Sequence, residues 1–317
     1  MVNRLFIFLS LIAGPALAEQ PALGLPLECT LGENCFVQQY MDLDETKDLR
    51  DFGGGKATYD GHKGTDFRLT SRVAMRHGVN VLASASGWVE ATRNSVVDRL
   101  LQTDYDFAEA KGIECGNGVL LVHRDGWKTQ YCHLKQGSII VKPGQMVQKG
   151  DALGQVGLSG KTQFPHVHIT VFKDGKNIDP FEPENNLWDD DLRAGLAYQP
   201  TRLINVGFAD AGVNMAEVAL EKFADFRPSH TAPALVVYMR AINLVKGDQI
   251  RLTLTGPNGQ IISKTYDPEA NQKAVQIYFA GKKLPAGGWP DGEYTGLAEV
   301  LRDGAVVDTN TVRKATP

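Results

Sequence analysis

The sequence lacks the features of nucleic-acid-binding and membrane-spanning proteins. Its formal net charge is −4 and its pI is near 6.0, and no run rich in Lys and Arg supplies the basic surface that phosphates require. Beyond the N-terminal segment, no apolar run approaches the roughly 20 residues of a spanning helix. A hydrophobic fraction of 43% still suffices for ordinary cores. We therefore expect a soluble, folded protein that binds no nucleic acid.

The N-terminus has the layout of a secretory signal peptide. A basic residue, Arg4, precedes a short apolar run, and small residues lead to an expected cleavage between Ala18 and Glu19. An uncleaved anchor is the alternative, but the apolar run is too short to span a bilayer. We expect residues 1–18 to be removed, which leaves a periplasmic or secreted protein without a membrane span.

Cysteine is scarce, and its even count favours disulfides in an exported chain. The spacings suggest one pair within a short loop, Cys29 with Cys35, and one pair across a hairpin, Cys115 with Cys132. Four cysteines allow three pairings, so the connectivity stays open. A zinc thiolate is the alternative for Cys132, but no Cys-x₂-Cys knuckle accompanies it.

The chain divides by composition into four regions after the signal peptide. Residues 19–57 form an irregular lead-in, and residues 58–182 contain many short strands broken by glycine turns. Residues 183–202 are polar, acidic and flanked by proline, which predicts a linker. Residues 203–317 contain short strands at regular spacing, which predicts an immunoglobulin-like β-sandwich.

Two local signals stand out in residues 58–182. Strand-like alternation on both sides of Asp125-Gly126 predicts a β-hairpin with a two-residue turn. Residues 94–112 instead show apolar residues at helical spacing, with Asn94 or Ser95 as a possible cap, which predicts a helical insertion. We expect a mainly β fold with this one helical interruption.

The stretch FPHVHITVF places His166 and His168 two residues apart, although the chain has only seven histidines. Side chains two apart on a strand point to the same face. Imidazole is the commonest metal ligand and a proton shuttle near neutral pH. The pair is compatible with a metal site, and a half-buried or surface pair is the alternative.

A second group lies upstream, in YDGHKGTDFRL. His62 and Asp66 are four apart, with glycines between them, so both side chains can reach one point. Two histidines and one carboxylate are the three protein ligands of a catalytic zinc, with the fourth position left for water. A surface loop with a salt bridge is the alternative. Spacing alone does not tell whether His166 or His168 would complete the set.

The glutamate base of helical zinc proteases is absent, because the sequence contains no His-Glu-x-x-His. The remaining candidates for proton transfer are histidines. His133 lies at the end of the predicted hairpin, in TQYCHLKQG. Together with whichever member of the His166/His168 pair does not bind metal, it is a candidate base and oxyanion stabiliser.

The motifs HKGTD, YCHL, VGLSGKTQFPHVH and DGKNIDP, in this order, resemble the lysostaphin-type (LytM) zinc metallopeptidases over residues 59 to 181. Members of that family cut peptides of bacterial peptidoglycan. The resemblance implies an antiparallel β peptidase domain (the duplicated hybrid motif). It also implies one Zn²⁺ held by His62, Asp66 and His168, with His133 and His166 as the catalytic pair.

The chain departs from the family pattern at two places beside the histidines. Phe164 replaces a common glycine, and Thr170 stands where a glutamate is often found. The ligand set is intact, so the departures concern substrate preference.

The resemblance implies an exported zinc endopeptidase that hydrolyses the peptide cross-links of peptidoglycan, with a zinc-activated water as nucleophile and two histidines assisting. The alternative is a non-catalytic cell-wall-binding regulator of a peptidoglycan amidase. The expected partners are peptidoglycan peptide stems, and the C-terminal region is a candidate for binding the cell wall or a protein.

Overall fold

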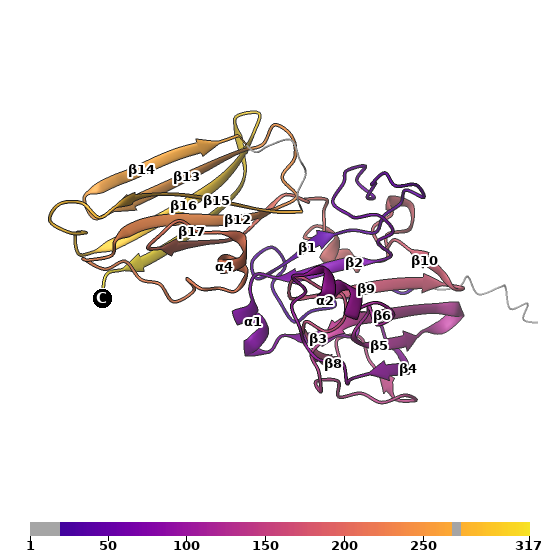
Figure 1. Ribbon diagram of the computed structural model, residues 1–317. Helices are drawn as coiled ribbons and strands as arrows, with labels where there is room; N and C mark the ends of the chain where they lie inside the picture. Colours follow the sequence, from indigo (N-terminus) through magenta and orange to yellow (C-terminus); the bar gives the residue numbers. More distant parts are fainter. Residues whose placement is uncertain (1–19, 268–273) are drawn as a thin grey trace, which may run out of the picture.

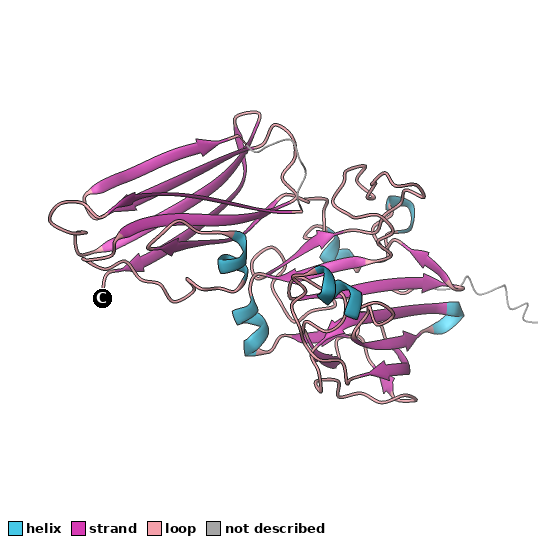
Figure 2. Cartoon of the chain, viewed as in Figure 1, coloured by secondary structure: helices cyan, strands magenta, loops and turns pink. Residues whose placement is uncertain are grey.

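The computed structural model describes residues 20–267 and 274–317, which form two β-rich parts lying beside each other (Figure 1). We call them the N-terminal part, residues 20–201, and the C-terminal sandwich, residues 202–317. Helices are few and short (Figure 2). The described strands pair antiparallel throughout, so the predicted mainly β, antiparallel fold is confirmed. The expected signal peptide lies outside the described residues.

The N-terminal part is built on one large sheet with the strand order β1-β2-β9-β6-β5-β4-β7, and β10 pairs with β9. A smaller sheet joins β3 and β8. The strands are β1 (Cys35–Gln39), β2 (Thr65–Leu69), β3 (Asn80–Leu82), β4 (Gly87–Arg93), β5 (Asn117–Val122), β6 (Trp127–Leu134), β7 (Met146–Val147), β8 (Ala152–Gln155), β9 (His166–Lys173) and β10 (Lys176–Ile178). The helices are α1 (Arg72–His77), α2 (Asp104–Glu109) and α3 (Asp190–Arg193), with 3-10 turns η1 (Arg124–Gly126) and η2 (Pro183–Asn185). None of the described helices has the length and apolar character needed to cross a bilayer.

The two faces of the large sheet have different roles. Because side chains alternate along a strand, Phe67 of β2 and Val167 of β9 point to one face, where both are fully buried in the core. Asp66 and His168 alternate with them and point to the opposite face. One face of the sheet therefore packs in the core, and the other face carries the polar side chains of Asp66 and His168.

The predicted hairpin is present, with β5 and β6 joined through η1. Asp125 has φ 54° and Gly126 has φ 76°, so both central residues adopt the left-handed conformation of the tight hairpin turns. The turn fixes the register of β6, and β6 in turn carries His133 at its far end.

The predicted insertion at 94–112 is helical only over α2, and its cap is neither Asn94 nor Ser95. Asn94 instead bonds to the backbone of Ile139 through both ends of its amide. Thr103 caps α2 through a reciprocal capping box with Asp106. The preceding residues are irregular, with an isolated β-bridge from Asp98 to Ser159. The cap prediction was wrong because side-chain bonds to a neighbouring loop outweigh local helical periodicity.

Two segments expected to be irregular contribute to the fold of the N-terminal part. The lead-in 19–57 supplies β1, which pairs with β2 and extends the large sheet. The segment 183–202 was predicted as a linker, yet it carries Trp188, which is fully buried and packs edge-on against Phe67. The boundaries drawn from composition stay predictions.

The C-terminal sandwich packs a three-stranded sheet, β11-β12-β15, against a four-stranded sheet, β14-β13-β16-β17. Its strands are β11 (Arg202–Ala209), β12 (Ala234–Ile242), β13 (Gln249–Gly256), β14 (Gly259–Tyr266), β15 (Val275–Lys283), β16 (Glu293–Arg302) and β17 (Ala305–Ala315), with one helix, α4 (Met215–Ala219). Alternate residues of both sheets form a shared apolar core that includes Val237, Leu252 and Tyr294. The two-sheet arrangement is present, and its assignment to the immunoglobulin-like class stays a prediction.

The sandwich contacts the N-terminal part along β1 and β2. Phe36 of β1 packs in one buried cluster with Ile204 and Ile242. The side-chain amide of Asn243 donates a 2.7 Å hydrogen bond to the Gln38 carbonyl of β1. The sandwich therefore lies against β1, the edge strand of the large sheet. The next strand, β2, carries Asp66.

Candidate metal centre

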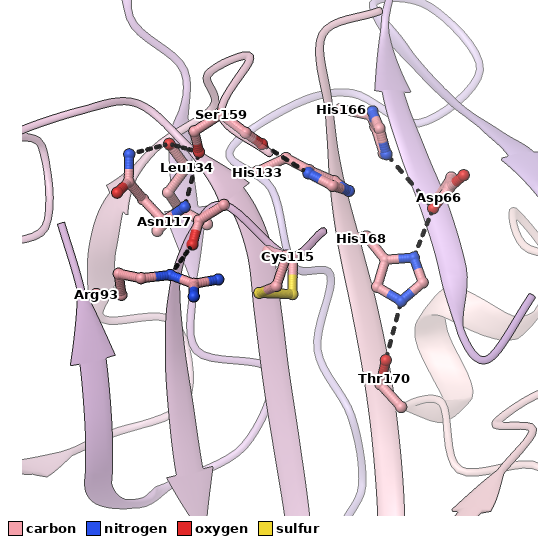
Figure 3. Close-up of a disulfide and its surroundings, with 12 residues drawn as sticks. Asp66, Arg93, Cys115, Asn117, His133, Leu134, Ser159, His166, His168 and Thr170 are labelled. Atoms are coloured by element: carbon pink, nitrogen blue, oxygen red, sulfur yellow. Dashed lines mark hydrogen bonds and ion pairs between the residues drawn. A yellow bond between two sulfur atoms is a disulfide. The ribbon is translucent and has the colours of Figure 1, made fainter. Parts of the chain in front are cut away.

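The register between β2 and β9 assembles most of the candidate centre. Asp66 lies directly opposite His168, and Arg68 lies opposite His166, so these side chains share the face away from the core. His62 approaches from the turn that precedes β2. Figure 3 shows Asp66 between His166 and His168, with His133 on the neighbouring strand. The structure thus brings together all five residues that the sequence singled out.

Three potential ligand atoms converge in this centre. His62 Nε2 lies 3.2 Å from Asp66 Oδ1 and 3.1 Å from His168 Nδ1. His168 Nδ1 lies 2.8 Å from the same Asp66 oxygen. These three residues form the one cluster of possible metal ligands found among the described residues, with ligand atoms all within 4.8 Å of one another. His166 lies outside that cluster, with its Nε2 at 3.5 Å from Asp66 Oδ1.

The outer hydrogen bonds aim one nitrogen of each ligand imidazole at the centre. His62 Nδ1 lies 2.6 Å from the Tyr40 carbonyl, which can only accept, so the imidazole donates there and its Nε2 carries a lone pair. His168 Nε2 contacts the Thr170 hydroxyl at 2.9 Å, which holds the ring with Nδ1 toward the centre. Two imidazole nitrogens and a carboxylate oxygen this close together are held by protons or by a cation between them.

The donor set and its spacing fit zinc. Two imidazole nitrogens and one carboxylate oxygen are the ligands of many catalytic zinc sites, which leave a fourth position open. A tetrahedron with metal–ligand distances of about 2.0–2.1 Å has edges of about 3.3–3.4 Å. The three separations are close to these edges, and His62 and Asp66 are buried. His62, Asp66 and His168 would therefore hold the ion.

The remaining two histidines lie next to this cluster with their own rings fixed. His166 Nδ1 lies 2.9 Å from the Phe164 carbonyl, and His133 Nδ1 lies 2.9 Å from the Ser159 carbonyl. Each imidazole therefore donates through Nδ1 and keeps Nε2 as a proton acceptor. The two rings lie 4.6 Å apart, between centroids. The two rings therefore lie beside the candidate ligand cluster as two possible proton acceptors.

The electrostatics of the centre separate the ligands from the pair. Burial alone would raise the pKa of Asp66, but His62, His166 and the hydrogen bond from His168 hold that pKa well below its usual range. Burial disfavours the charged form of His62, yet the Asp66 carboxylate outweighs it and raises the pKa of His62. Asp66 is thus a carboxylate at neutral pH, which is the form that binds a metal.

The pKa values of His133 and His166 are lowered, whereas that of His62 is raised. Burial, together with the neighbouring rings of His166 and His168, lowers the pKa of His133 well below its usual range. Burial also lowers the pKa of His166. Both imidazoles are therefore neutral near pH 7 and able to accept a proton.

The backbone of His133 is held in an unusual conformation. Its φ is 66°, in the left-handed region that few residues other than glycine adopt. Three contacts secure it: the Cys115–Cys132 disulfide on the preceding residue, a 2.8 Å bond from its own N–H to the Cys115 carbonyl, and the Ser159 bond. Such conformations concentrate where a site requires one side-chain direction.

Both expected disulfides are present in the structure, Cys29–Cys35 and Cys115–Cys132. Because its sulfur is bonded to Cys115, Cys132 is not a zinc thiolate. Of the two departures from the family pattern, Thr170 orients His168, and Phe164 stacks on the His166 ring at 4.3 Å between centroids.

Sequence analysis missed the backbone carbonyls that fix the histidine tautomers, those of Tyr40, Ser159 and Phe164. Carbonyl positions depend on tertiary packing, so no residue type could have indicated them. It also missed Arg68, which is buried on the same face and stacks over Phe164.

A buried acid close to the centre gives a pH-dependent prediction. Asp179 follows β10 and is 2% exposed; its Oδ1 accepts from the Phe181 N–H, and its Oδ2 has no partner among the described residues. Burial raises the pKa of Asp179 from 3.8 to about 6, partly offset by the Phe181 bond. The folded state thus binds this proton more tightly than the unfolded state. Its contribution to stability is present below about pH 4 and is lost as pH rises through about 6.

We expect Asp179→Asn to stabilise the chelator-treated protein at pH 7 by on the order of 2–3 kcal/mol, because the amide needs no proton to stay neutral. At pH 4 the gain should shrink toward zero. Urea denaturation at both pH values measures it, with the exposed Asp190→Asn as the control. An equal gain at the two pH values would contradict the assignment.

Comparison with known proteins finds a similarity to one peptidase family over part of the chain. Residues 60–180 match the model of peptidase family M23. The peptidoglycan DD-endopeptidase ShyA of Vibrio cholerae is 32% identical over 117 residues, which are 37% of this chain and 21% of that protein. The cell division protein DipM of Caulobacter vibrioides is 34% identical over 127 residues, 38% of this chain and 18% of that protein. The chain thus spans about a fifth of the length of these curated relatives.

Among solved structures, the catalytic domain of lysostaphin from Staphylococcus simulans aligns with a TM-score of 0.29 and 23% identity, over 45% of this chain and 86% of that one. A zinc-containing peptidase from Vibrio cholerae aligns with a TM-score of 0.29 and 24% identity, over 46% of this chain and 39% of that one.

Proposed function

We propose that this chain, whose residues 60–180 match the model of peptidase family M23, is an exported zinc endopeptidase that hydrolyses peptide cross-links in bacterial peptidoglycan. The observation that carries the proposal is the convergence of three potential ligand atoms, from His62, Asp66 and His168, beside the imidazoles of His133 and His166. Relatives named peptidoglycan DD-endopeptidases support the substrate class.

The metal, the paired histidines and the groups that orient the ligands would each have a separate role in the hydrolysis. Zinc, when bound, would polarise the scissile carbonyl and lower the pKa of a water to about 7. His166 and His133, each with a free Nε2 beside the ligand cluster, would orient and deprotonate the attacking water and stabilise the oxyanion. Thr170 and the Tyr40 carbonyl would keep the two ligand imidazoles in the metal-binding tautomer.

Two sequence features support export. The N-terminal segment has the layout of a signal peptide, with cleavage expected after Ala18. All four cysteines form disulfides, which persist in oxidising compartments such as the periplasm. The peptidoglycan lies in the same compartment. We favour the D-alanyl–diaminopimelate cross-link as substrate, because it is a link between D-centres and several relatives are named DD-endopeptidases.

Digestion of purified peptidoglycan by the mature protein, residues 19–317, tests the proposal. We expect loss of cross-linked dimers, measured by mass spectrometry of the released fragments. A chelator should abolish the loss and added zinc should restore it, because the three ligands leave the metal exchangeable through its open position.

Stoichiometric zinc with every cross-link intact would overturn the peptidase proposal. That result would favour the alternative, a regulator that binds the cell wall or a peptidoglycan amidase. Chelator-resistant cleavage would instead exclude the metal centre as its cause.

A further inference from the structure

A cleft of about 300 Å³ lies between the two parts of the molecule, close to the metal centre. We call it the interdomain cleft. The N-terminal part contributes β1 and the segment 54–58 to its lining, and the C-terminal sandwich contributes the residues that follow β12. The lining residues used below are Gln39, Leu49, Lys56, Thr58, Leu244 and Val245.

The interdomain cleft adjoins the metal ligands through two short connections. Gln39 is the direct partner of Asp66 in the β1–β2 register, and Cα atoms of such partners lie about 4.5–5.5 Å apart. Thr58 donates a 2.8 Å bond to the Tyr40 carbonyl, which also accepts from the ligand imidazole of His62. The cleft and the metal ligands are therefore connected through one strand pair and one shared carbonyl.

The polar groups of the cleft are incompletely paired. Gln39 is 5% exposed, and its Oε1 has no hydrogen-bond partner among the described residues. A buried amide oxygen without a donor is costly unless a ligand supplies one. Lys56 is exposed at the cleft, and it forms no ion pair with any described acidic residue. The cleft thus presents one acceptor and one cation.

The rest of the lining is apolar and comes from both parts. Leu49 belongs to the lead-in, and Leu244 and Val245 belong to the sandwich. An acceptor, a cation and small apolar walls together complement an N–H donor, a carboxylate and an aliphatic side chain. A peptide residue with a free carboxylate carries all three groups.

We propose that the interdomain cleft is a substrate subsite for a peptide residue that bears a free carboxylate. Gln39 accepts the backbone N–H of that residue, and Lys56 pairs with its carboxylate. The inference rests on the proposed function, because it places the residue next to the bond that the metal centre would cut. It gives the C-terminal sandwich a direct role, since Leu244 and Val245 complete the wall.

A binding experiment tests the subsite without requiring turnover. The mature protein is titrated with a synthetic stem tetrapeptide that ends in a free D-alanine carboxylate, and with the same peptide as its C-terminal carboxamide. We expect the carboxylate form to bind about fivefold more tightly, as an exposed ion pair of favourable geometry allows. Lys56→Met should remove this preference, and Lys47→Met, an exposed lysine of the same lead-in that does not line the cleft, should keep it.

Two further variants test the walls of the cleft. Gln39→Leu should weaken both peptides by about fivefold, the value of one hydrogen bond. Val245→Trp, on the sandwich side, should weaken both by filling the cleft, while the thermal unfolding profile stays close to that of the parent.

Loss of the preference in Lys56→Met but not in Lys47→Met would support the subsite. A preference that survives Lys56→Met, or no binding of either peptide to the parent protein, would overturn it. If the protein prefers the carboxylate peptide but does not cleave peptidoglycan, the proposed function is wrong and the subsite is supported. If it cleaves peptidoglycan but binds both peptides equally, the subsite is wrong and the proposed function is supported.

Discussion

Replacing His133 with alanine should leave the metal bound and reduce peptidoglycan cleavage by about 10²- to 10⁴-fold, the usual contribution of a general acid–base group. His133 stands apart from the ligand cluster, with its ring centroid 6.1 Å from that of His168. Removing its imidazole therefore takes away a proton acceptor and leaves three ligands. Metal content after dialysis and the rate of dimer loss measure the two effects separately.

Variants of the ligands should show the opposite pattern. Asp66→Ala and His62→Ala should lose both the metal and the activity, because two ligands hold zinc poorly. His133→Asn tolerates the left-handed backbone and should lose as much activity as His133→Ala, which separates chemistry from folding. His77→Ala, at the exposed end of α1, is the unaffected control. Stoichiometric zinc in His62→Ala would refute its role as a ligand.

Replacing Trp188 with alanine should lower the free energy of unfolding by about 3–5 kcal/mol, as expected for a large aromatic side chain lost from a core. Trp188 is 1% exposed and contacts both Phe67 and Phe181, at 5.5 and 5.3 Å between ring centroids. Phe67 lies directly between Asp66 and Arg68 in β2, so the loss should also loosen the strand that carries a metal ligand. Urea denaturation followed by circular dichroism measures the change.

Trp88 provides a matched control, because it is the same residue type in the same N-terminal part but is 55% exposed. Trp88→Ala should change stability by no more than about 0.5 kcal/mol. An equally small loss of unfolding free energy in Trp188→Ala would mean that residues 183–202 are not part of the N-terminal core.

The candidate site was predictable as a set of residues but not as a geometry. Spacing alone placed His166 and His168 on one face and left open which of them joins His62 and Asp66. The structure separates them by register, since His168 lies opposite Asp66 and His166 opposite Arg68. Register depends on the pairing of strands 100 residues apart, which a local pattern does not encode.

The fold was predictable where local chemistry decides it. Asp125-Gly126 specifies its own turn, so the hairpin was predicted correctly. Strand β1 was missed because its five residues are buried throughout and show no alternation. The insertion was predicted as helical over too long a range, since Leu101 and its neighbours follow helical spacing but are fixed by contacts with another loop.

The position of β1 also bears on what a truncated protein would do. β1 is the outermost strand of the large sheet, and its Gln38 carbonyl and Phe36 ring are covered by Asn243, Ile204 and Ile242 of the sandwich. Without residues 202–317, an edge strand with a bare carbonyl and an exposed aromatic ring would face solvent. Such edges pair with other chains. The isolated N-terminal part should therefore self-associate, because in the full chain the sandwich covers this edge.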